Sequence, residues 1–594
     1  MHRKFFAFLI AGLFYLAASS VALAAGGACP SGAPVTGNNC YFIAANGTDT
    51  NNGTSEATPW LHAPGMPNCS GTCNNISPSS GNGFIFRGGD TWHFGNSSAA
   101  PYTGGTWAIS AAGNSSTCVY EGTQSGCIYF GVDLTWYNSS VCGSSWCRPI
   151  MNGDNPTSTT TVSSCAYQIG SNNQLIYQNS GGYYNILDNL ELLGLCTQHT
   201  TGGNNNSDVY IEDSGSGVTG QGMLFQTNLY IHGWTATTTA GTGNNALACN
   251  MIGGGNQSLH SIVALVVDGS DSDPQVCAWA IFPSFYHIKD SMIRYATQGV
   301  GQYCHDIHDN IFEHFYVPNI PTHGNILECN DDNPGNAPGQ PQNTPNVVYN
   351  NIVRHDSPAF ATAGDPHFWF CPESVPEYWF NNLMYDIGGQ AWDYAGPTNY
   401  GCTNTGGQIM FNNTLVDVVQ PCYVPTVSHG GQYLTVYNEH LINTPFDSGT
   451  TACTGVGAGQ NIMTDATATA QGYTTGSGGT DGGSNTCAND ATKPCSPTSA
   501  TNGTVGAGGN QMAYCTALAG YSSEYAIGTE AANACKNGTT DGCAYNSTTH
   551  TMSCPGQVAV ARPLSGAWDS GAYQFSSVVT GAPQAPTSLA ATAK

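Results

Sequence analysis

One short phrase recurs seven times between residues 286 and 443, and it limits the possible folds more than any other feature. The phrase reads apolar, any residue, Asn/Asp/Gly, Asn, any residue, apolar, any residue. Its copies are HIKDSMIR at 287–294, DIHDNIFE at 306–313, PTHGNILE at 321–328, VVYNNIVR at 347–354, YWFNNLMY at 378–385, IMFNNTLV at 409–416 and TVYNEHLI at 435–442. A unit this short cannot bury its apolar residues alone, so the copies have to stack on one another. The chain is therefore expected to form a solenoid.

The two apolar positions of each phrase define the expected core. Because side chains alternate along a strand, these two positions should both point toward the axis of the solenoid. Only Thr322 is polar among the fourteen residues, which are Ile288/Ile293, Ile307/Phe312, Thr322/Leu327, Val348/Val353, Trp379/Met384, Met410/Leu415 and Val436/Leu441.

The second corner position is Asn in five of the seven copies. It is occupied by Ser291, Asn310, Asn325, Asn351, Asn382, Asn413 and Glu439. Asn tolerates a bent backbone, and its amide can hydrogen-bond to the Asn of the next coil, which is typical of a parallel β-helix. Corner spacings of 26 and 31 residues suit one three-sided coil with a variable loop, but the spacing of 15 before Asn325 is too short. Asn325 is therefore expected on a different side of the coil.

The N-terminus has the features of a secretory signal. A basic start at His2, Arg3 and Lys4 precedes an apolar run and the small-x-small site Ala22-Leu23-Ala24. No later run approaches the roughly 20 apolar residues of a membrane-spanning helix. We predict a signal peptide at 1–24, a β-helix domain at 25–575 with a Gly/Thr/Ser/Cys-rich insertion or loop at 447–555, and a linker-like tail at 576–594. The mature protein should be secreted or attached to the cell surface.

Charge and cysteine content restrict the partners. The chain has 11 basic and 37 acidic residues, a net charge of −26, so a nucleic-acid partner is excluded because phosphate binding needs a basic surface. The 24 cysteines all follow the signal and predict disulfides, with Cys69/Cys73, Cys142/Cys147, Cys487/Cys495 and Cys535/Cys543 as plausible local pairs. We expect a monomer without an integral membrane segment.

Three segments carry a family resemblance. YFIAANGTDTNNGTSEATPW at 41–60 and GFIFRGGDTWHF at 83–94 resemble the opening of secreted pectate-lyase-like proteins, and RPLSGAWDSGAYQF at 562–575 resembles their closing phrase. The resemblance implies an all-β fold, a right-handed parallel β-helix, to which the cysteine pairs add long disulfide-stapled loops. It is specific for the fold and weak for the chemistry.

The outward positions before the corner suggest a sugar-binding strip. They read Lys289, His308, His323, Tyr349, Phe380, Phe411 and Tyr437. Four aromatic rings in a row facing solvent would let sugar rings stack on them. The alternative is that loops cover these rings and make them a second small core.

The outward positions after the corner concentrate charge. They read Arg294, Glu313, Glu328, Arg354, Tyr385, Val416 and Ile442. Proton abstraction beside a uronic-acid carboxylate needs a base and positive charge on the developing enolate. Lys289, Arg294 or Arg354 would be the base or the clamp, His308 or His323 the proton carrier, and Glu313, Glu328 and Tyr385 would contact substrate. The alternative is that Arg294 and Arg354 only form ion pairs with Glu313 and Glu328.

Nearby carboxylates predict a calcium site. Ca²⁺ takes several oxygen ligands and would bridge to a substrate carboxylate. The candidate ligands are Asp306, Asp309, Asp331, Asp332 and Asp356. His305 and His308 also have metal-ligand spacing, but on a strand they should point to different faces, which disfavours a transition metal at that pair.

These features favour a carbohydrate-active or carbohydrate-binding protein that acts on an extracellular, acidic polysaccharide. The preferred reaction is β-elimination, although the motifs of polygalacturonase-like hydrolases and of the best-known pectate lyases are absent. Two alternatives stay open, a non-catalytic adhesin and a glycoside hydrolase that uses two carboxylates.

Overall fold

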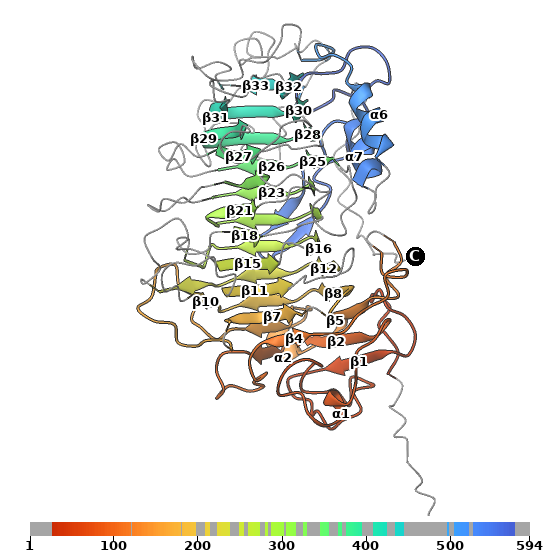
Figure 1. Cartoon of the computed structure of the whole chain (residues 1–594), viewed down its shortest axis with the longest axis vertical. Helices are drawn as coiled ribbons and strands as arrows, with labels where there is room; N and C mark the ends of the chain where they lie inside the picture. Colours follow the sequence, from red (N-terminus) through yellow and green to blue (C-terminus); the bar gives the residue numbers. More distant parts are fainter. Residues whose placement is uncertain are drawn as a thin grey trace, which may run out of the picture.

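The computed structural model describes residues 26–119, 122–170, 172–179, 181–197, 208–213, 223–237, 249–254, 259–273, 279–282, 287–301, 305–315, 325–329, 345–355, 366–370, 376–394, 408–423, 434–442, 444, 496–497, 500, 504–521 and 527–576. The predicted signal peptide and the tail beyond residue 576 lie outside these ranges. The described strands stack into an elongated, three-sided parallel β-helix (Figure 1). The predicted β-helix fold is confirmed.

Each side of the coil is a ladder of parallel strands. The first side is a 12-stranded sheet of β1 (Cys40–Ile43), β2 (Gly83–Gly88), β5 (Ile128–Tyr137), β8 (Asn185–Asp188), β12 (Met223–Thr227), β16 (Leu259–Val263), β19 (His287–Lys289), β22 (Asp306–His308), β25 (Asn346–Tyr349), β28 (Glu377–Phe380), β30 (Gln408–Phe411) and β32 (Leu434–Tyr437). The second side contains β3 (Thr91–His93), β6 (Ile150–Asn152), β9 (Glu191–Leu193), β13 (Tyr230–His232), β17 (Val266–Asp268), β20 (Met292–Arg294), β23 (Ile311–Glu313), β26 (Ile352–Arg354) and β33 (His440–Ile442). The third side contains β4 (Trp107–Ile109), β7 (Gln174–Gln178), β11 (Asp208–Asp213), β15 (Cys249–Gly254), β18 (Trp279–Phe282), β21 (Gln298–Gly301), β24 (Leu327–Cys329) and β27 (Pro366–Phe370).

Two long strands connect the second side with the third. They are β29 (Leu383–Tyr394) and β31 (Thr414–Tyr423), and they join the two ladders into one 19-stranded sheet. A short pair, β10 (Cys196–Thr197) and β14 (Thr235–Ala236), and two single-turn helices, α1 (Gly71–Asn74) and α2 (Ser139–Cys142), lie among the early coils.

The core runs along the axis, as the repeat predicts. Thirteen of the fourteen inward residues belong to one buried apolar cluster, in which Trp379 is 2% exposed and Met410 fully buried; Thr322 lies outside the described residues. This burial of apolar area supplies the main driving force for stacking the coils.

The corner side chains form a continuous buried ladder of hydrogen bonds. Nδ2 of Asn310, Asn351 and Asn382 each donates to Oδ1 of the Asn in the next coil at 3.0 Å, and Nδ2 of Asn413 donates to Oε1 of Glu439 at 3.0 Å. The backbone N–H groups of these asparagines add bonds along the same column. The predicted Asn column is confirmed for this side.

The residue before each ladder position adopts the left-handed conformation. Asp290, Asp309, Asn350, Asn381 and Asn412 have φ between 56° and 60°, a region that Asn and Asp enter more readily than other side chains. This explains why the repeat favours Asn or Asp at the first corner position and Asn at the second. The first residue turns the backbone through its left-handed conformation, and the second forms side-chain hydrogen bonds to the neighbouring coils.

Asn325 does not belong to this ladder. The strand after it, β24, pairs with β21 and β27 on the third side of the coil. The expectation from the 15-residue spacing is therefore confirmed, and Glu328, predicted in the same column as Arg294, lies on the third side instead.

The described disulfides confirm part of the predicted pairing. Cys69–Cys73 and Cys142–Cys147 form as predicted, but Cys535 pairs with Cys515 and Cys543 pairs with Cys554. The predicted Cys535/Cys543 bond is wrong because helix geometry brings Cys535 back to Cys515. Further bonds join Cys29–Cys40, Cys118–Cys127 and Cys165–Cys196; Cys487 and Cys495 lie outside the described residues.

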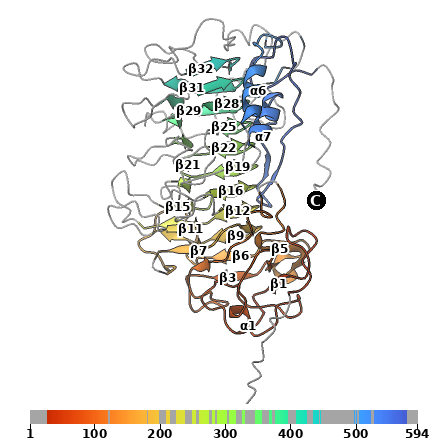
Figure 2. The same ribbon diagram turned by 45° about the vertical axis from the view of Figure 1, so that its right-hand side comes forward.

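A C-terminal segment folds back over the coils. We call residues 504–521 and 527–576 the strap; it contains α6 (Met512–Gly520), α7 (Ile527–Cys535) and the antiparallel pair β34 (Ala544–Asn546) and β35 (Thr551–Ser553). Figures 1 and 2 show it in blue, with α6 and α7 beside β25 and β28. Part of the predicted insertion at 447–555 is thus an ordered cover. No helix in the described ranges is long and apolar enough to span a membrane.

The left-handed corner residues hold the strap in place. Nδ2 of Asn381 donates to the carbonyl of Asn537 at 2.9 Å, and Nδ2 of Asn412 donates to the carbonyls of Asp569 and Gly571 at 2.8 and 3.0 Å. The closing phrase at 562–575 contributes Arg562, whose Nη2 donates to Oδ1 of Asn381 at 2.9 Å. The left-handed corner residues Asn381 and Asn412 therefore bind the strap to the coil through hydrogen bonds.

Glu439, at the end of the ladder, makes stability depend on pH. Burial raises the pKa of its carboxyl to about 8, so the folded state binds a proton that the unfolded chain releases above its ordinary pKa. The contribution of protonated Glu439 to the free energy of unfolding is fully present below about pH 4.5 and is lost as the pH rises toward 8. We expect Glu439→Gln, which keeps the acceptor for Asn413, to unfold nearly like wild type near pH 5 and to be more stable by on the order of 4 kcal/mol near pH 8. Melting temperatures measured across this range check it, and equal pH slopes for both proteins would contradict it.

Candidate functional site

Two outward columns run along the coils, one on each side of the corner. On the first side, strand register aligns Lys289, His308, Tyr349, Phe380, Phe411 and Tyr437. On the second side it aligns His232, Asp268, Arg294, Glu313, Arg354, Tyr385, Val416 and Ile442. The predicted columns are therefore confirmed for these residues but not for Glu328, and two further coils extend the second column.

The aromatic part of the first column is sealed beneath α6. Tyr349 stacks on Phe380 at 5.0 Å between ring centroids and Phe380 on Phe411 at 5.1 Å, and these three rings are at most 2% exposed. Tyr514 of α6 stacks on Phe411 at 5.5 Å and also contacts half-buried Tyr437. The prediction of an open sugar-binding strip is wrong, because the strap makes these rings a second core.

The charged part of the first column lies beneath α7. His308 Nδ1 contacts Asp309 Oδ2 at 2.6 Å, and His308 Nε2 lies 3.6 Å from Glu530 Oε2 and 3.9 Å from Asp306 Oδ2. Lys289 Nζ lies 3.6 Å from Glu530 Oε1. Lys289 and His308, predicted as base and proton carrier, are thus covered by the strap and do not border an open groove.

Electrostatics in this cluster favour fixed charges. Burial by itself would lower the pKa of His308, but Asp306, Asp309 and Glu530 raise it to about 10. Burial and the neighbouring Asp309 raise the pKa of Asp290 to about 6. A histidine that binds its proton this firmly is poorly matched to proton transfer near neutral pH.

The second column is a ladder of alternating charge. Arg294 Nε lies 3.7 Å from Asp268 Oδ1 and 3.3 Å from Glu313 Oε1, while Arg354 Nε contacts Glu313 Oε2 at 2.6 Å and its Nη1 donates to the Tyr385 hydroxyl at 3.0 Å. The ion-pair alternative is confirmed for Glu313. Tyr385 is fully buried, so its predicted contact with substrate is wrong.

A stack of half-buried rings borders this charged column. Tyr295 stacks on His314 at 4.7 Å and His314 on His355 at 5.5 Å, and the Arg294 guanidinium lies 4.7 Å from the Tyr295 ring centre. All three ring residues are left-handed, with φ of 50°, 56° and 59°. Our sequence analysis missed them, although each directly follows the last residue of a repeat phrase.

His232, which begins the charged column, lies between two carboxylates. Its Nδ1 contacts Asp271 Oδ2 at 2.8 Å and its Nε2 contacts Glu191 Oε1 at 3.1 Å. Burial opposes protonation, but the two carboxylates raise the pKa of His232 to about 9, and the contact with His232 helps lower the pKa of Asp271. The side chains of Glu191 and Asp271 are 22% and 41% exposed, which makes them the more accessible acids of this surface.

The strap also borders the second column. The Tyr545 hydroxyl donates to Asp268 Oδ2 at 3.0 Å, and the Arg294 guanidinium lies 5.4 Å from the Tyr545 ring centre. His550 stacks on Tyr230 at 4.1 Å, and Tyr230 stacks on His232 at the same distance. The hairpin of β34 and β35 therefore covers one edge of the column and leaves the Tyr295 side partly exposed, with 19% of the His314 side chain accessible.

Several predicted site residues are not placed by the structure. His323, Asp331, Asp332 and Asp356 lie outside the described residues, as does the side chain of Glu328. The calcium prediction, which depends on three of these aspartates, stays a prediction.

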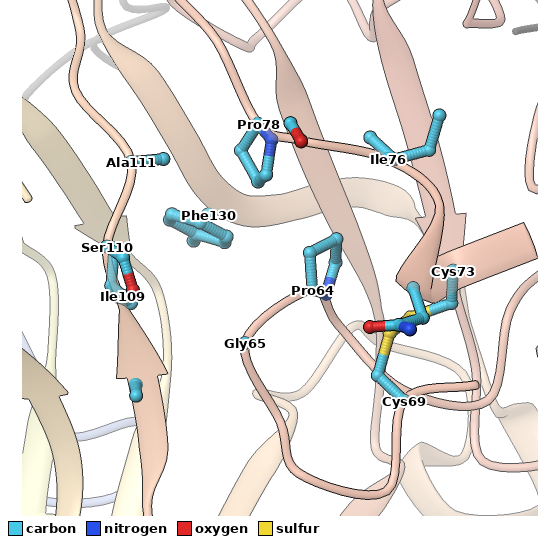
Figure 3. Close-up of a pocket in the computed structure, with 13 residues that line it drawn as sticks. Pro64, Gly65, Cys69, Cys73, Ile76, Pro78, Ile109, Ser110, Ala111 and Phe130 are labelled. Atoms are coloured by element: carbon cyan, nitrogen blue, oxygen red, sulfur yellow. A yellow bond between two sulfur atoms is a disulfide. The ribbon is translucent and has the colours of Figure 1, made fainter.

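A separate pocket of about 310 Å³ lies between the loop at 64–78 and β4. Pro64, Ile76, Pro78, Ile109 and Phe130 contribute most of its labelled apolar wall (Figure 3), and its lining contains no charged residue. It belongs to the early coils and does not adjoin either column.

Comparisons with known proteins support no specific family. No protein-family model matches the chain, and no curated protein matches it. Two crystal structures of the GH136 lacto-N-biosidase from Eubacterium ramulus, a selenomethionine derivative and the native protein, are similar at 11% identity, with TM-scores of 0.35 and 0.34. The matches cover 72% and 68% of this chain and 67% and 62% of the other. A likeness this distant carries no argument about activity.

Proposed function

We propose that this is a secreted protein that binds an extracellular polysaccharide along the second side of its coil. The proposal is carried by one observation, the half-buried stack of Tyr295, His314 and His355 beside Arg294. Each of three successive coils contributes one ring, so similar contacts recur along the axis of the coil. A polymer made of repeating sugar units could make the same contact at each coil. The disulfides are in accord with an oxidising compartment.

An acidic polymer suits this surface. Arg294 and the two imidazoles are donors at its partly exposed edge, and a charge-assisted hydrogen bond to a carboxylate is stronger than a neutral one. The chain as a whole is acidic, with a net charge of −26, and should repel an acidic polymer. Electrostatic attraction of the polymer should therefore be confined to this edge. Binding should weaken as salt is added.

The geometry does not favour β-elimination by the residues first predicted for it. Lys289 and His308 lie under α7, and burial, which lowers the pKa of Arg294, is outweighed by Glu313 and Asp268, which raise it further above its ordinary value. Such a guanidinium can stabilise negative charge but is a poor base. A lyase reaction would need a base from residues outside this cluster.

Hydrolysis is the second candidate function, favoured by Glu191 and Asp271. Glycoside hydrolases use two carboxylates on either side of the scissile bond. These two carboxylates both contact His232 and are partly exposed, and the lowered pKa of Asp271 keeps it ionised. In this mechanism Asp271 would be the ionised carboxylate and Glu191 the second carboxylate.

A panel of uronate and neutral polysaccharides tests both candidates. Affinity electrophoresis measures binding, new reducing ends report hydrolysis, and absorbance of an unsaturated product reports elimination. We expect Tyr295→Ala with His314→Ala to weaken binding at least tenfold, from lost stacking of roughly 1 kcal/mol per ring. Tyr177→Ala, a half-buried tyrosine on the third side, is the matched control and should bind normally.

Each readout decides between the candidates. Binding without a product identifies a non-catalytic adhesin, and reducing ends that disappear in Asp271→Asn identify a hydrolase. Unchanged affinity of the Tyr295/His314 double variant for every bound polymer would remove the second side as the binding surface.

A further inference from the structure

A cluster of imidazoles and carboxylates brings the strap and two coils together at one point. It contains His287 of β19, Asp306 and His308 of β22, and Glu530 of α7. His287 Nδ1 lies 3.0 Å from Asp306 Oδ2, His308 Nε2 lies 3.9 Å from the same oxygen, and His308 Nε2 lies 3.6 Å from Glu530 Oε2. Two of these separations are too long for hydrogen bonds. All three suit ligand atoms around one small metal ion, whose tetrahedral neighbours are roughly 3.4 Å apart.

Several polar atoms in the cluster are buried without a hydrogen bond. They are Nε2 of His308, Oδ1 of Asp306 and Oε2 of Glu530, and they remain unsatisfied among the described residues. Asp306 is fully buried and His308 is 5% exposed. A buried polar atom without a hydrogen bond is costly even when the rest of its side chain has a partner, so native proteins supply a partner for most such atoms.

The surrounding residues orient two of these atoms, Nε2 of His308 and Oε2 of Glu530, toward one another. Asp309 contacts His308 Nδ1 at 2.6 Å, which makes that nitrogen the donor and leaves Nε2 as the nitrogen that can exchange its proton for a metal ion. Lys289 contacts Oε1 of Glu530 and so turns Oε2 toward His308. Carboxylates that hold the distal nitrogen of a ligand histidine are typical outer partners of protein metal sites.

We propose that His287, Asp306, His308 and Glu530 bind one divalent transition-metal ion of the Zn²⁺ class. Two imidazole nitrogens and two carboxylate oxygens are a ligand set that zinc accepts, whereas calcium takes six to eight oxygens. The metal replaces the proton that Nε2 of His308 would otherwise hold. Because all four ligands come from the protein, the site is structural, and it fastens α7 to the coil.

Metal binding by the full mature chain tests this proposal. After chelator treatment, Zn²⁺ is titrated against a chromophoric competitor, and Co²⁺ is added separately to record its visible absorption. We expect one equivalent of Zn²⁺ per chain, a tetrahedral Co²⁺ spectrum and a rise of several degrees in melting temperature with Zn²⁺. Glu530→Gln should weaken Zn²⁺ binding at least tenfold, and Asp306→Asn should abolish the Co²⁺ spectrum.

Controls separate this site from general affinity for metals. His93→Ala removes a histidine that pairs with Asp154 in an early coil and should leave the Zn²⁺ equivalent intact. Glu530 is 26% exposed on a helix, so Glu530→Gln should fold even if Asp306→Asn does not, and circular dichroism verifies this. The proposal is overturned if the wild-type chain takes up no equivalent of Zn²⁺, if it takes up Ca²⁺ in preference, or if folded Glu530→Gln binds like wild type.

Discussion

Replacing Trp568 with alanine is expected to detach the strap and expose the ring column beneath it. Trp568 is fully buried, its Nε1 donates to the carbonyl of Pro563 at 2.8 Å, and the Arg562 guanidinium lies 5.2 Å from its ring centre. Truncating a buried tryptophan costs about 3–5 kcal/mol. We expect the strap to unfold in a separate transition below that of the coil, with a large rise in binding of an apolar dye as Phe380 and Phe411 become exposed.

Leu564→Ala is the matched control for this experiment. Leu564 lies four residues away in the same segment but is 77% exposed, so its loss should change the unfolding curve by less than about 0.5 kcal/mol. Limited proteolysis gives an independent readout, with faster cleavage within 504–576 for Trp568→Ala only. A single cooperative transition and no dye binding in that variant would show that the strap does not depend on this anchor.

Asn351→Ala is expected to destabilise the coil itself. The Asn351 side chain donates to Asn382 Oδ1 at 3.0 Å and to the carbonyl of Ile307 at 2.9 Å, and it accepts from the amide of Asn310 at 3.0 Å. Its removal leaves buried partners on both neighbouring coils without bonds, at about 1–3 kcal/mol each. The free energy of unfolding should fall by roughly 4 kcal/mol, measured by denaturant titration.

Asn533→Ala serves as the comparison, because Asn533 lies exposed on α7. Its unfolding midpoint should match wild type. A similarly small effect of Asn351→Ala would mean that the hydrogen-bond ladder adds little to the stability that apolar stacking already provides. The earlier coils show that the corner can be built without the ladder. Their equivalent corner position is occupied by fully buried leucines, Leu190, Leu229 and Leu265.

The repeat phrase was sufficient to predict the coil. Its period of two around a fixed corner identified inward residues such as Ile307 and Val348, and its Asn column identified the ladder. Even the irregular spacing before Asn325 was informative, because it indicated a different side. The inward positions and the Asn column depend only on residues within one phrase or in the neighbouring coil. They can therefore be predicted from the repeat pattern alone.

The site could not be predicted in the same way because a distant segment changes its surroundings. Outward rings at Tyr349 and Phe380 look identical in sequence whether water or α6 covers them. Nothing in the phrase indicates that Glu530 reaches His308, more than 200 residues earlier in the chain. The half-buried rings at Tyr295, His314 and His355 were accessible to sequence reasoning, but they lie one residue beyond the repeat that we aligned.

The path of the strap has a consequence for biogenesis. Arg148 donates to the carbonyls of Thr549 and His550, contacts that join residues 401 and 402 positions apart. Such contacts can form only after the chain has been made as far as His550, whereas coils can assemble progressively from the N-terminal end. A prematurely terminated chain would therefore display a row of naked aromatic rings. An exposed apolar row of this kind favours aggregation, so the strap protects the coil by covering it.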